Sequence, residues 1–400
     1  MLTTDVILTA NTRPACGGPH LIRCSAGGVF QSVAHKGLSV RWTDLMSHAK
    51  GNVPDAPVEN MANVCCYPVF FGNKVSAFQH IKAVRNAKNA PRQIIVFGTF
   101  AASFPEEILS RQLADIVVFF DPEFVIPLIL SVLADGTSLS TIPNLAYMDQ
   151  EKMKMTAKHS FHDLDAIPFI SPYLYVQGDR PAYMITARGC QYHCVFCDRN
   201  ALWGGGIRER SVENVLNEIR ELVSTYPVEI IRFLDEDFVA NQKRLLMLCE
   251  GIRRIRGKFL WECSACVDSV TEKGLLLMGH SGCRKINLGV ESASPNVLRR
   301  IGKRYGRQDI LNAVGWARKA KIQVEVMITT GNPQETDFDH QLTLAALNEL
   351  GRDGVSITTN RLVILPGTPI YRQGLKEGRY TSESFFEDEG LVFYNEKDLV

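Results

Sequence analysis

Apolar runs alternate with amphipathic segments along the first 150 residues of the chain. Runs typical of buried strands occupy residues 6–8, 38–42, 64–71, 93–98 and 116–120. Residues 20–36, 74–88, 105–112 and 122–133 have helical character. This alternation predicts parallel β-α-β units, and therefore a doubly wound, Rossmann-like α/β domain over residues 1–150. Because ligands bind at the carboxyl ends of such strands, we expect a site among residues 9–18, 70–74, 98–103 and 121–123.

A second series of β/α units begins near residue 182. It predicts strands at residues 182–186, 229–234, 259–265, 285–289, 324–329 and 354–365, with helices such as 211–224 and 240–256 between them. Six units of this kind predict an open, partial barrel over residues 181–372. Residues 151–180 have mixed polarity and several prolines, which is typical of a linker. Residues 373–400 form a polar, acidic tail.

Composition and charge limit which cellular compartment and which binding partners we expect. The 44 basic and 43 acidic residues give a net charge of +1, so no large basic field would attract nucleic acid or an anionic membrane. The most apolar stretch, residues 116–134, contains acidic residues and prolines and is not typical of a membrane span. The first residues lack a secretory pattern, and eleven cysteines then indicate a reducing compartment. We expect a cytoplasmic protein that binds neither nucleic acid nor membrane.

Three cysteines lie within eight residues, in the spacing C-x3-C-x2-C formed by Cys190, Cys194 and Cys197. A [4Fe–4S] cluster normally takes four thiolates, so three leave one iron open to chelate a small molecule and pass it an electron. A zinc site is the alternative, with His193 or a distant cysteine as fourth ligand. Four later cysteines, at positions 249, 263, 266 and 283, are either a second cluster or small buried residues.

The cysteine loop and four later segments resemble the radical SAM superfamily, whose members cleave S-adenosylmethionine (SAM) at a [4Fe–4S] cluster. The later segments are FLDEDF at residues 233–238, GVES at 289–292, TGNPQET at 330–336 and PGTP at 366–369. The resemblance implies that Cys190, Cys194 and Cys197 hold the cluster. It further implies that SAM contacts Phe196, Asp235, Glu236, Glu291, Ser292, Gly331, Asn332 and Pro333.

The amino-terminal half resembles the cobalamin-binding domain that precedes the barrel in one subgroup of this superfamily. The resemblance lies in the order of units, in residues 95–98 and in residues 164–168. Thr99 and Phe100 stand where relatives carry a glycine-rich loop, and residues 121–124 replace a G-E-G-E turn. In the barrel, Cys266 stands where relatives often carry arginine. These departures favour a domain that keeps the fold without the corrinoid, and they leave cobalamin binding uncertain.

The resemblance implies a 5′-deoxyadenosyl radical that takes hydrogen from a small, polar, sugar-like substrate. We favour radical dehydration, deoxygenation or dehydrogenation, as in the dehydratases of aminoglycoside antibiotic biosynthesis such as the apramycin pathway. The alternative is a cobalamin-dependent methyltransferase. An external donor of the flavodoxin or ferredoxin type is expected, and a partner reductase would be needed for an oxidised intermediate. Candidate acid–base residues are Tyr192, His193 and Glu236, and candidate substrate residues are Asp121, Glu123 and Asp237, although Asp121 and Glu123 could instead cap the helix that begins at residue 122.

Overall fold

The computed structural model describes residues 2–9, 19–45, 61–170, 181–203, 206–351, 354–386 and 392–394. The chain divides into two compact units. The first unit contains Met1–Tyr175 with Ala201–Gly204, and the second contains Val176–Asn200 with Gly205–Val400. Most of the predicted ligand loop at residues 9–18 lies outside the described residues, as do residues 171–180 of the expected linker.

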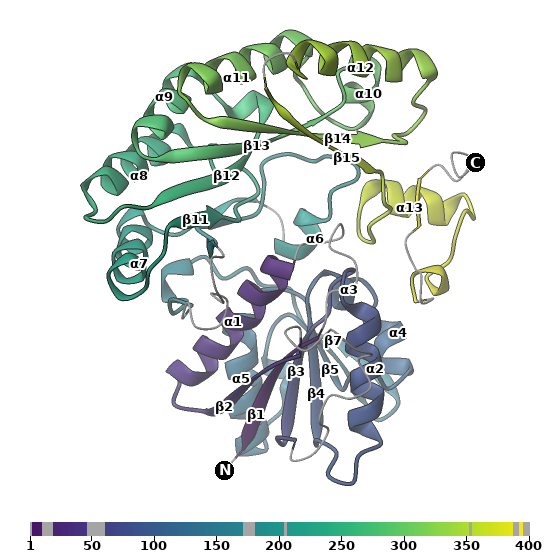
Figure 1. Cartoon of the computed structure of the whole chain (residues 1–400). Coiled ribbons are helices and arrows are strands. Elements are labelled where there is room, and N and C mark those ends of the chain that lie inside the picture. Colours follow the sequence, from purple (N-terminus) through teal and green to yellow (C-terminus); the bar gives the residue numbers. More distant parts are fainter. Residues whose placement is uncertain are drawn as a thin grey trace. The chain divides into compact units, whose positions relative to one another are not determined.

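The first unit is built on one sheet, which has seven strands within the described residues. Their order is β2-β1-β3-β4-β5-β6-β7, and every pair from β2 to β5 is parallel (Figure 1). This confirms the predicted Rossmann-like α/β fold. The strands are β1 (Thr3–Leu8), β2 (Ser39–Asp44), β3 (Val64–Pro68), β4 (Gln93–Phe97), β5 (Ile116–Val118), β6 (Leu145–Asp149) and β7 (Lys152–Met155).

The central strands are continuous apolar runs because helices cover both faces of the sheet. Figure 1 shows α1 and α5 on one face and α2 and α4 on the other. Val6, Cys66 and Ile95 are fully buried in the core that α1 and α5 complete. The helices of this unit are α1 (Pro19–His35), α2 (Lys74–Arg85), α3 (Thr99–Ser103), α4 (Pro105–Ser110) and α5 (Pro122–Asp135).

Two elements of the first unit were not predicted. Strands β6 and β7 form an antiparallel hairpin that extends the sheet across residue 150. Its turn residues, Gln150 and Glu151, have positive φ angles of 45° and 69°. Hairpin turns of this kind usually carry Asn-Gly or a similar pair, so residues 150 and 151 contain no recognisable turn signal. Residues 99–103, which were expected in a ligand loop, form the short helix α3.

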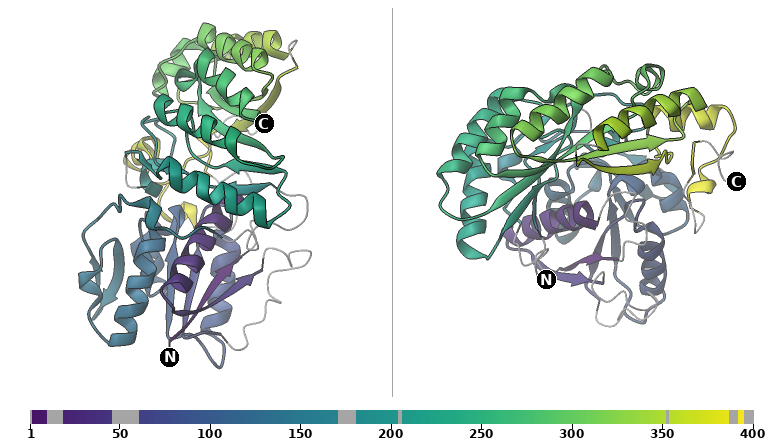
Figure 2. Two further views of the ribbon diagram at one scale, coloured as in Figure 1. Left: turned by 90° about the vertical axis from the view of Figure 1, so that its left-hand side faces the viewer. Right: turned by 45° about the horizontal axis from the view of Figure 1, so that its top comes forward.

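The second unit contains a six-stranded sheet within the described residues, in the order β15-β14-β13-β12-β11-β8. All neighbouring strands are parallel, which confirms the six predicted β/α strands. Helices α7, α8, α9, α11 and α12 lie along one face of this sheet (Figure 2). The strands are β8 (Ala182–Met184), β11 (Ile230–Phe233), β12 (Leu260–Cys266), β13 (Cys283–Glu291), β14 (Gln323–Thr330) and β15 (Ser356–Arg361).

Side-chain caps fix where most of these helices begin. Ser211, Asn241 and Thr271 accept hydrogen bonds from the first-turn amides of α7, α8 and α9, which satisfies donors that a helix leaves unpaired. Among the described helices, none is both long and apolar enough to cross a membrane. The helices are α6 (Arg199–Trp203), α7 (Val212–Thr225), α8 (Gln242–Arg254), α9 (Glu272–His280), α10 (Pro295–Arg300), α11 (Arg307–Lys319), α12 (Asp337–Gly351) and α13 (Pro369–Lys376).

Glu262, near the start of β12, is a buried carboxylate between two arginines. Its side chain is 1% exposed. Arg232 Nε donates to Glu262 Oε2 at 2.7 Å, and Arg284 Nε donates to Glu262 Oε1 at 2.8 Å. Burial alone would raise the Glu262 pKa, but the hydrogen bonds from Arg284 and Arg232 outweigh it and hold the pKa below its ordinary value. The cluster therefore ties β11, β12 and β13 together through charge.

We expect Glu262→Gln to lower the free energy of unfolding by about 1–3 kcal/mol at pH 7, because it removes a charged, buried acceptor. A lowered carboxyl pKa stabilises the fold above the ordinary glutamate pKa and loses that effect as the pH falls through the folded-state pKa. The difference in the free energy of unfolding between wild type and variant should therefore be smaller at pH 4 than at pH 7. Urea unfolding followed by circular dichroism at pH 7 and pH 4 measures it. Glu349→Gln, which breaks the exposed pair with Arg307, should cost under about 1 kcal/mol, and a gap that widens in acid contradicts the account.

Candidate functional site

The cysteine loop leaves the sheet through a two-stranded hairpin in which β9 (Ala187–Arg188) pairs with β10 (Arg208–Glu209). Gly189 follows β9 with a φ of 89°, a conformation that favours glycine. A Cβ added at Gly189 would lie 1.7 Å from the carbonyl oxygen of Gly206. Only glycine therefore fits at the residue that precedes Cys190.

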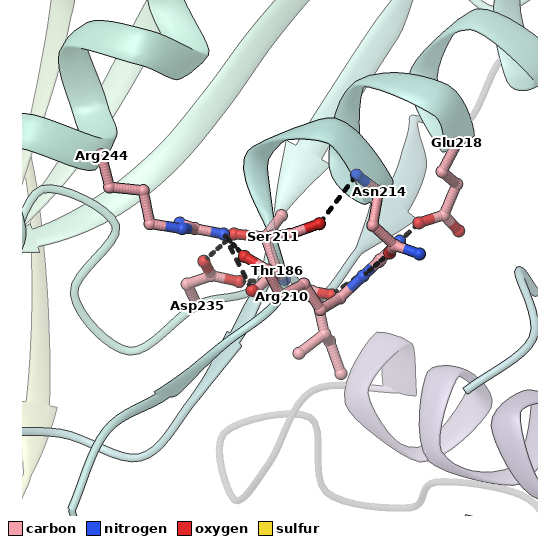
Figure 3. A network of polar contacts seen from close by, with 8 residues as sticks. Thr186, Arg210, Ser211, Asn214, Glu218, Asp235 and Arg244 are labelled. Carbon is pink, nitrogen blue, oxygen red and sulfur yellow. Dashed lines mark hydrogen bonds and ion pairs between the residues drawn. The ribbon is translucent and has the colours of Figure 1, made fainter. Parts of the chain in front are cut away.

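A polar network holds this hairpin to the sheet (Figure 3). The amide of Thr186 donates to Asp235 Oδ1 at 2.6 Å, and the Thr186 hydroxyl donates to Asp235 Oδ2. Arg244 Nη2 donates to the carbonyls of Thr186 and Arg210 at 3.0 and 3.2 Å. Asp235 was predicted to meet SAM, but these contacts show it joining the end of β8 to the segment after β11. Its role toward SAM stays a prediction.

Arg210 extends the network to helix α7. It pairs with Glu218 at 2.5 Å and donates through Nε to Asn214 Oδ1 at 2.7 Å (Figure 3). Its Nη1 also donates to the carbonyl of Ile185 at 3.1 Å. Arg210 and Arg244 thus hold the end of the β9–β10 hairpin that lies opposite the cysteine loop, where the chain enters at Thr186 and leaves at Arg210.

The three predicted cluster cysteines are half-buried and form a compact loop. The Cys197 amide donates to the Cys194 carbonyl at 3.2 Å, and the Val195 amide donates to the Ile301 carbonyl at 3.2 Å. Burial raises the pKa of Cys190 to about 11 and that of Cys197 to about 12. Because the thiolate is the form that binds metal, these sulfurs need a positive partner, and iron would supply it.

Two cations lie beside the loop, each near a carboxylate. Arg199 Nε lies 3.0 Å from Glu236 Oε2, and Lys303 Nζ lies 3.9 Å from Glu291 Oε1. Burial raises the pKa of Cys194, whereas the charge of Lys303 and a hydrogen bond from it lower it. The structure therefore brings the predicted residues Glu236 and Glu291 to the cysteine loop, each paired with a cation.

A single metal ion does not fit the arrangement. Among the described residues, no three His, Cys, Asp or Glu side chains converge as the ligands of one ion would. A cube takes one thiolate per iron, so its sulfurs need not converge on one point. Both the zinc site and the second cluster therefore lack support in the part of the chain that the structure describes. Cys249, Cys263 and Cys283 are buried, and Cys263 contacts Cys283.

Tyr192 and Asp237, two further candidates, are joined through Ser269. The Tyr192 hydroxyl lies 2.8 Å from Ser269 Oγ, which donates to Asp237 Oδ2. The Cys266 amide donates to Asp237 Oδ1 at 3.3 Å. Burial raises the pKa of Asp237 to about 6, although these hydrogen bonds oppose the rise. His193, by contrast, is exposed.

The two predicted residues of the GVES segment, Glu291 and Ser292, lie in different surroundings. Glu291 follows an irregularity in β13, has a φ of 61°, and accepts a hydrogen bond from Thr329 Oγ1 at 2.7 Å. Ser292 is fully buried, and its hydroxyl lies 2.9 Å from Thr343 Oγ1 on helix α12. Glu291 thus lies with Lys303 beside the cysteine loop, whereas Ser292 anchors α12.

The turn after β14 contains a buried hydrogen-bond acceptor that has no donor among the described residues. Gly331 has a φ of 76°, and Asn332 is fully buried. Asn332 Nδ2 donates to the Thr329 carbonyl at 2.5 Å, but Asn332 Oδ1 has no donor among the described residues. Asn287 Oδ1, on β13, is likewise buried without one. Buried acceptors normally have a partner, so both fit a site for a ligand with donor groups such as SAM.

Three residues of this site were missed from the sequence, namely Arg199, Asn287 and Lys303. Arg199 lies two positions after Cys197, and such closeness to a cluster cysteine is the one signal that was present. Asn287 was missed because it lies within residues 285–289, which were interpreted only as a buried strand. Lys303 lies more than 100 positions after the cysteines, so only the fold could bring it to them. Phe196 is half-buried and Pro333 lies in the turn beside Asn332.

The candidate substrate residues Asp121 and Glu123 lie inside the first unit. Asp121 is 1% exposed, and its Oδ2 accepts a hydrogen bond from the Phe161 amide at 3.2 Å. It makes no side-chain cap on α5. Glu123 is 5% exposed and packs so closely on Gly28 of α1 that a Cβ there would lie 2.9 Å from Glu123 Cγ. Both carboxylates thus take part in packing, and a substrate role stays a prediction.

The similarity to a known family lies mainly in the second unit. Residues 184–347 match the radical SAM superfamily, and they contain the cysteine loop, Asp235–Asp237, Glu291 and the turn at Asn332. This part of the chain is therefore similar to radical SAM domains. The match confirms the two cofactors predicted from the sequence, a [4Fe–4S] cluster and SAM.

Curated relatives include methyltransferases. The chain is 28% identical over 299 residues to an uncharacterized methyltransferase of Pyrococcus horikoshii, covering 72% of this chain and 65% of that protein. It is 22% identical to the cytidylyl-2-hydroxyethylphosphonate methyltransferase of Streptomyces wedmorensis, covering 77% of this chain and 66% of that protein. The chain therefore spans slightly less than two thirds of the length of these relatives.

Solved structures of similar fold cover both units. The radical SAM methyltransferase TsrM from Kitasatospora setae, solved with cobalamin and a [4Fe–4S] cluster, has a TM-score of 0.78 at 16% identity, covering 94% of this chain and 75% of that one. The cobalamin-dependent radical SAM enzyme OxsB, solved with aqua-cobalamin and SAM, has a TM-score of 0.78 at 18% identity, covering 94% and 61%. The radical SAM domain therefore follows a domain with the fold found in cobalamin-binding relatives.

These comparisons change the balance between the two functions considered from the sequence. They support the methyltransferase alternative better than the dehydratase that we favoured, and nothing in them supports a resemblance to the apramycin enzyme. The dehydratase interpretation rested on the altered loops at residues 98–103 and 121–124 and on the short segment after the barrel.

Proposed function

We propose that the protein is a cobalamin-dependent radical SAM methyltransferase acting on a small, polar molecule. A bound [4Fe–4S] cluster would supply an electron to SAM, and a bound corrinoid would carry the methyl group. The chain contributes three thiolates from Cys190, Cys194 and Cys197, and two cations, Arg199 and Lys303, that neutralise charge beside them. Asn287 and Asn332 offer buried acceptors to the donor groups of SAM.

The observation that carries the proposal is the position of Phe100. From the sequence, this bulky residue was expected to occupy the glycine-rich loop of corrinoid-binding relatives. Instead it is fully buried, and its ring centroid lies 5.0–5.8 Å from those of Phe71, Phe78 and Phe104. Phe100 is thus a buried residue of α3 that packs on other aromatic side chains, and it is not exposed to a ligand at the carboxyl edge of the sheet.

The strand order supplies a place for such a ligand. In the order β2-β1-β3-β4-β5, the chain reverses direction across the sheet between β1 and β3, and ligands of doubly wound sheets bind at that point. Asn73 Nδ2 donates to Thr9 Oγ1 at 3.1 Å and to the Pro68 carbonyl at 2.8 Å, which ties the ends of β1 and β3. Gly98, with a φ of 106°, comes so close to the Val69 carbonyl that a Cβ would lie 2.7 Å away.

An electron donor and an acid–base group follow from this proposal as expectations. The first electron would come from an external donor of the flavodoxin or ferredoxin type. The Tyr192–Ser269–Asp237 chain offers an acid–base group, because burial raises the Asp237 pKa to about 6.

The test is corrinoid retention by the full chain. Anaerobically reconstituted protein is incubated with hydroxocobalamin, freed of excess by gel filtration, and examined by absorption spectroscopy and cobalt analysis. We expect about one corrinoid per chain, and transfer of a labelled methyl group from SAM to an acceptor when substrates are screened. The Cys194→Ala variant should keep the corrinoid but lose the cluster, because the first unit is a separate compact part of the fold. Full iron content with no retained corrinoid would overturn the proposal.

A further inference from the structure

We propose that Lys303 is a positioning residue that raises the reduction potential of the [4Fe–4S] cluster by directing its ammonium group at the sulfur of Cys194. The inference deepens the proposed function and rests on it, because it requires the cluster. It concerns a residue that the motifs of the sequence did not single out.

Lys303 is an unusually buried lysine. Its side chain is 5% exposed. Its Nζ donates a hydrogen bond to Cys266 Sγ at 3.4 Å and lies 3.9 Å from Glu291 Oε1, and its charge acts on the nearby Cys194 thiol. A buried ammonium is costly unless nearby groups compensate its charge. The contacts of Lys303 therefore identify which groups provide that compensation.

One carboxylate is not enough to account for this position. Glu291 lies at the outer limit of an ion pair, and its other oxygen accepts a closer hydrogen bond from Thr329 Oγ1 at 2.7 Å. Besides Glu291, Lys303 Nζ has the Tyr305 ring, whose centroid lies 5.8 Å away, the charge of Asp237, and the sulfurs of Cys266 and Cys194 as neighbours. Neutral thiols are weak acceptors, whereas the thiolate ligands of a cluster are anionic, and together three of them outweigh the charge of an oxidised cube. The bound cluster is thus the partner that this ammonium fits.

The backbone holds Lys303 against the cysteine loop. The Ile301 carbonyl accepts the amide of Val195 at 3.2 Å. Gly302 has a φ of 85°, and a Cβ there would lie 3.4 Å from the His193 carbonyl oxygen and 3.7 Å from Cys194 Cα. Residues 301–303 therefore pack directly on residues 193–195, and this packing places Lys303 beside the cysteine loop.

The charge of Lys303 should shift the reduction potential of the cluster upward. Reduction adds an electron to the cluster, and a fixed positive charge with a hydrogen bond to a ligand sulfur stabilises the added charge. Hydrogen bonds to sulfur and net charge are both established determinants of cluster potentials. Removing the ammonium should therefore make the cluster harder to reduce.

The experiment is a redox titration of the reconstituted full chain without SAM, followed by electron paramagnetic resonance (EPR). For Lys303→Met we expect at least a tenfold loss in the equilibrium constant for reduction, a shift of about 59 mV to lower potential for a one-electron couple. Lys303→Arg should restore most of it. The matched control is Lys285→Met, which removes a lysine from the opposite end of the same sheet, where Lys285 pairs with Glu325 at 2.6 Å, and it should leave the potential unchanged.

Iron content separates the possible outcomes. If no protein, wild type included, holds iron, the proposed function fails. If Lys303→Met holds a full cluster at the wild-type potential, this inference alone is overturned. If Lys303→Met loads less iron than wild type, the titration uses Lys303→Gln, which keeps a donor and loses the charge, and a wild-type potential in that variant overturns the inference equally.

Discussion

Alanine at any one of Cys190, Cys194 or Cys197 is expected to abolish cluster retention and SAM cleavage. Each cysteine would hold one iron, and a cube held by only two thiolates would have two open corners. Outer-shell partners of metal sites are typically worth about 10–100-fold, so the loss of a ligand itself should exceed 100-fold. Iron and sulfide analysis after anaerobic reconstitution, together with 5′-deoxyadenosine formation in the presence of dithionite, measures both effects.

The chain offers matched controls for this prediction. Cys249 and Cys283 are buried cysteines of the same unit that lie outside the loop. Cys249→Ala and Cys283→Ala should lose some stability and keep the wild-type iron content. Equal iron loss in the controls would mean that unfolding, rather than ligation, explains the result, and full iron content in a loop variant would contradict the account.

Gly189→Ala is expected to disrupt the cysteine loop as severely as losing a cysteine. The added methyl would lie 1.7 Å from the Gly206 carbonyl oxygen, and it would occupy a residue with a φ of 89°. The left-handed conformation alone costs roughly 1–2 kcal/mol in a non-glycine residue. With the backbone overlap, the cost should exceed about 4 kcal/mol, the range reached only by specific structural defects. We expect the β9–β10 hairpin to open and the variant to load less iron.

The matched control is Gly315→Ala. Gly315 lies within helix α11, and a Cβ there would have no heavy atom within 4 Å. Replacing glycine by alanine inside a helix should raise stability by about 0.5–1 kcal/mol. Thermal unfolding and iron content of the two variants, compared with wild type, separate the special backbone of Gly189 from a general effect of added methyl groups. A Gly189→Ala protein with wild-type iron content would contradict this role for the hairpin.

Much of the fold was predictable because buried parallel strands are continuous apolar runs. All six strands of the second sheet and the first five of the other were found from such runs. The β6–β7 hairpin was missed because Gln150 and Glu151 adopt positive φ angles that sequence rarely assigns to them. Helix α3 was missed because it has only five residues, too few to show a helical period.

The site was predictable where its residues are close together in sequence, and less so where the fold assembles it. The cysteine loop was evident from spacing, and the match to the radical SAM superfamily confirms its cofactors. Lys303 reaches Cys194 only because residues 301–303 pack on the loop, which no local pattern indicates. Phe100 was interpreted as an obstruction because its position was known but not its direction, and the structure shows that it points into the core of the first unit.

The central claim is that three cysteines hold a cube whose fourth iron is open to SAM. EPR spectroscopy of the reduced, reconstituted full chain, recorded with and without SAM, tests it most directly. The account predicts a [4Fe–4S] signal in both samples, with a spectrum that changes on adding SAM because SAM becomes a ligand of the open iron. A signal that is identical with and without SAM, or the absence of any iron–sulfur signal, would contradict it.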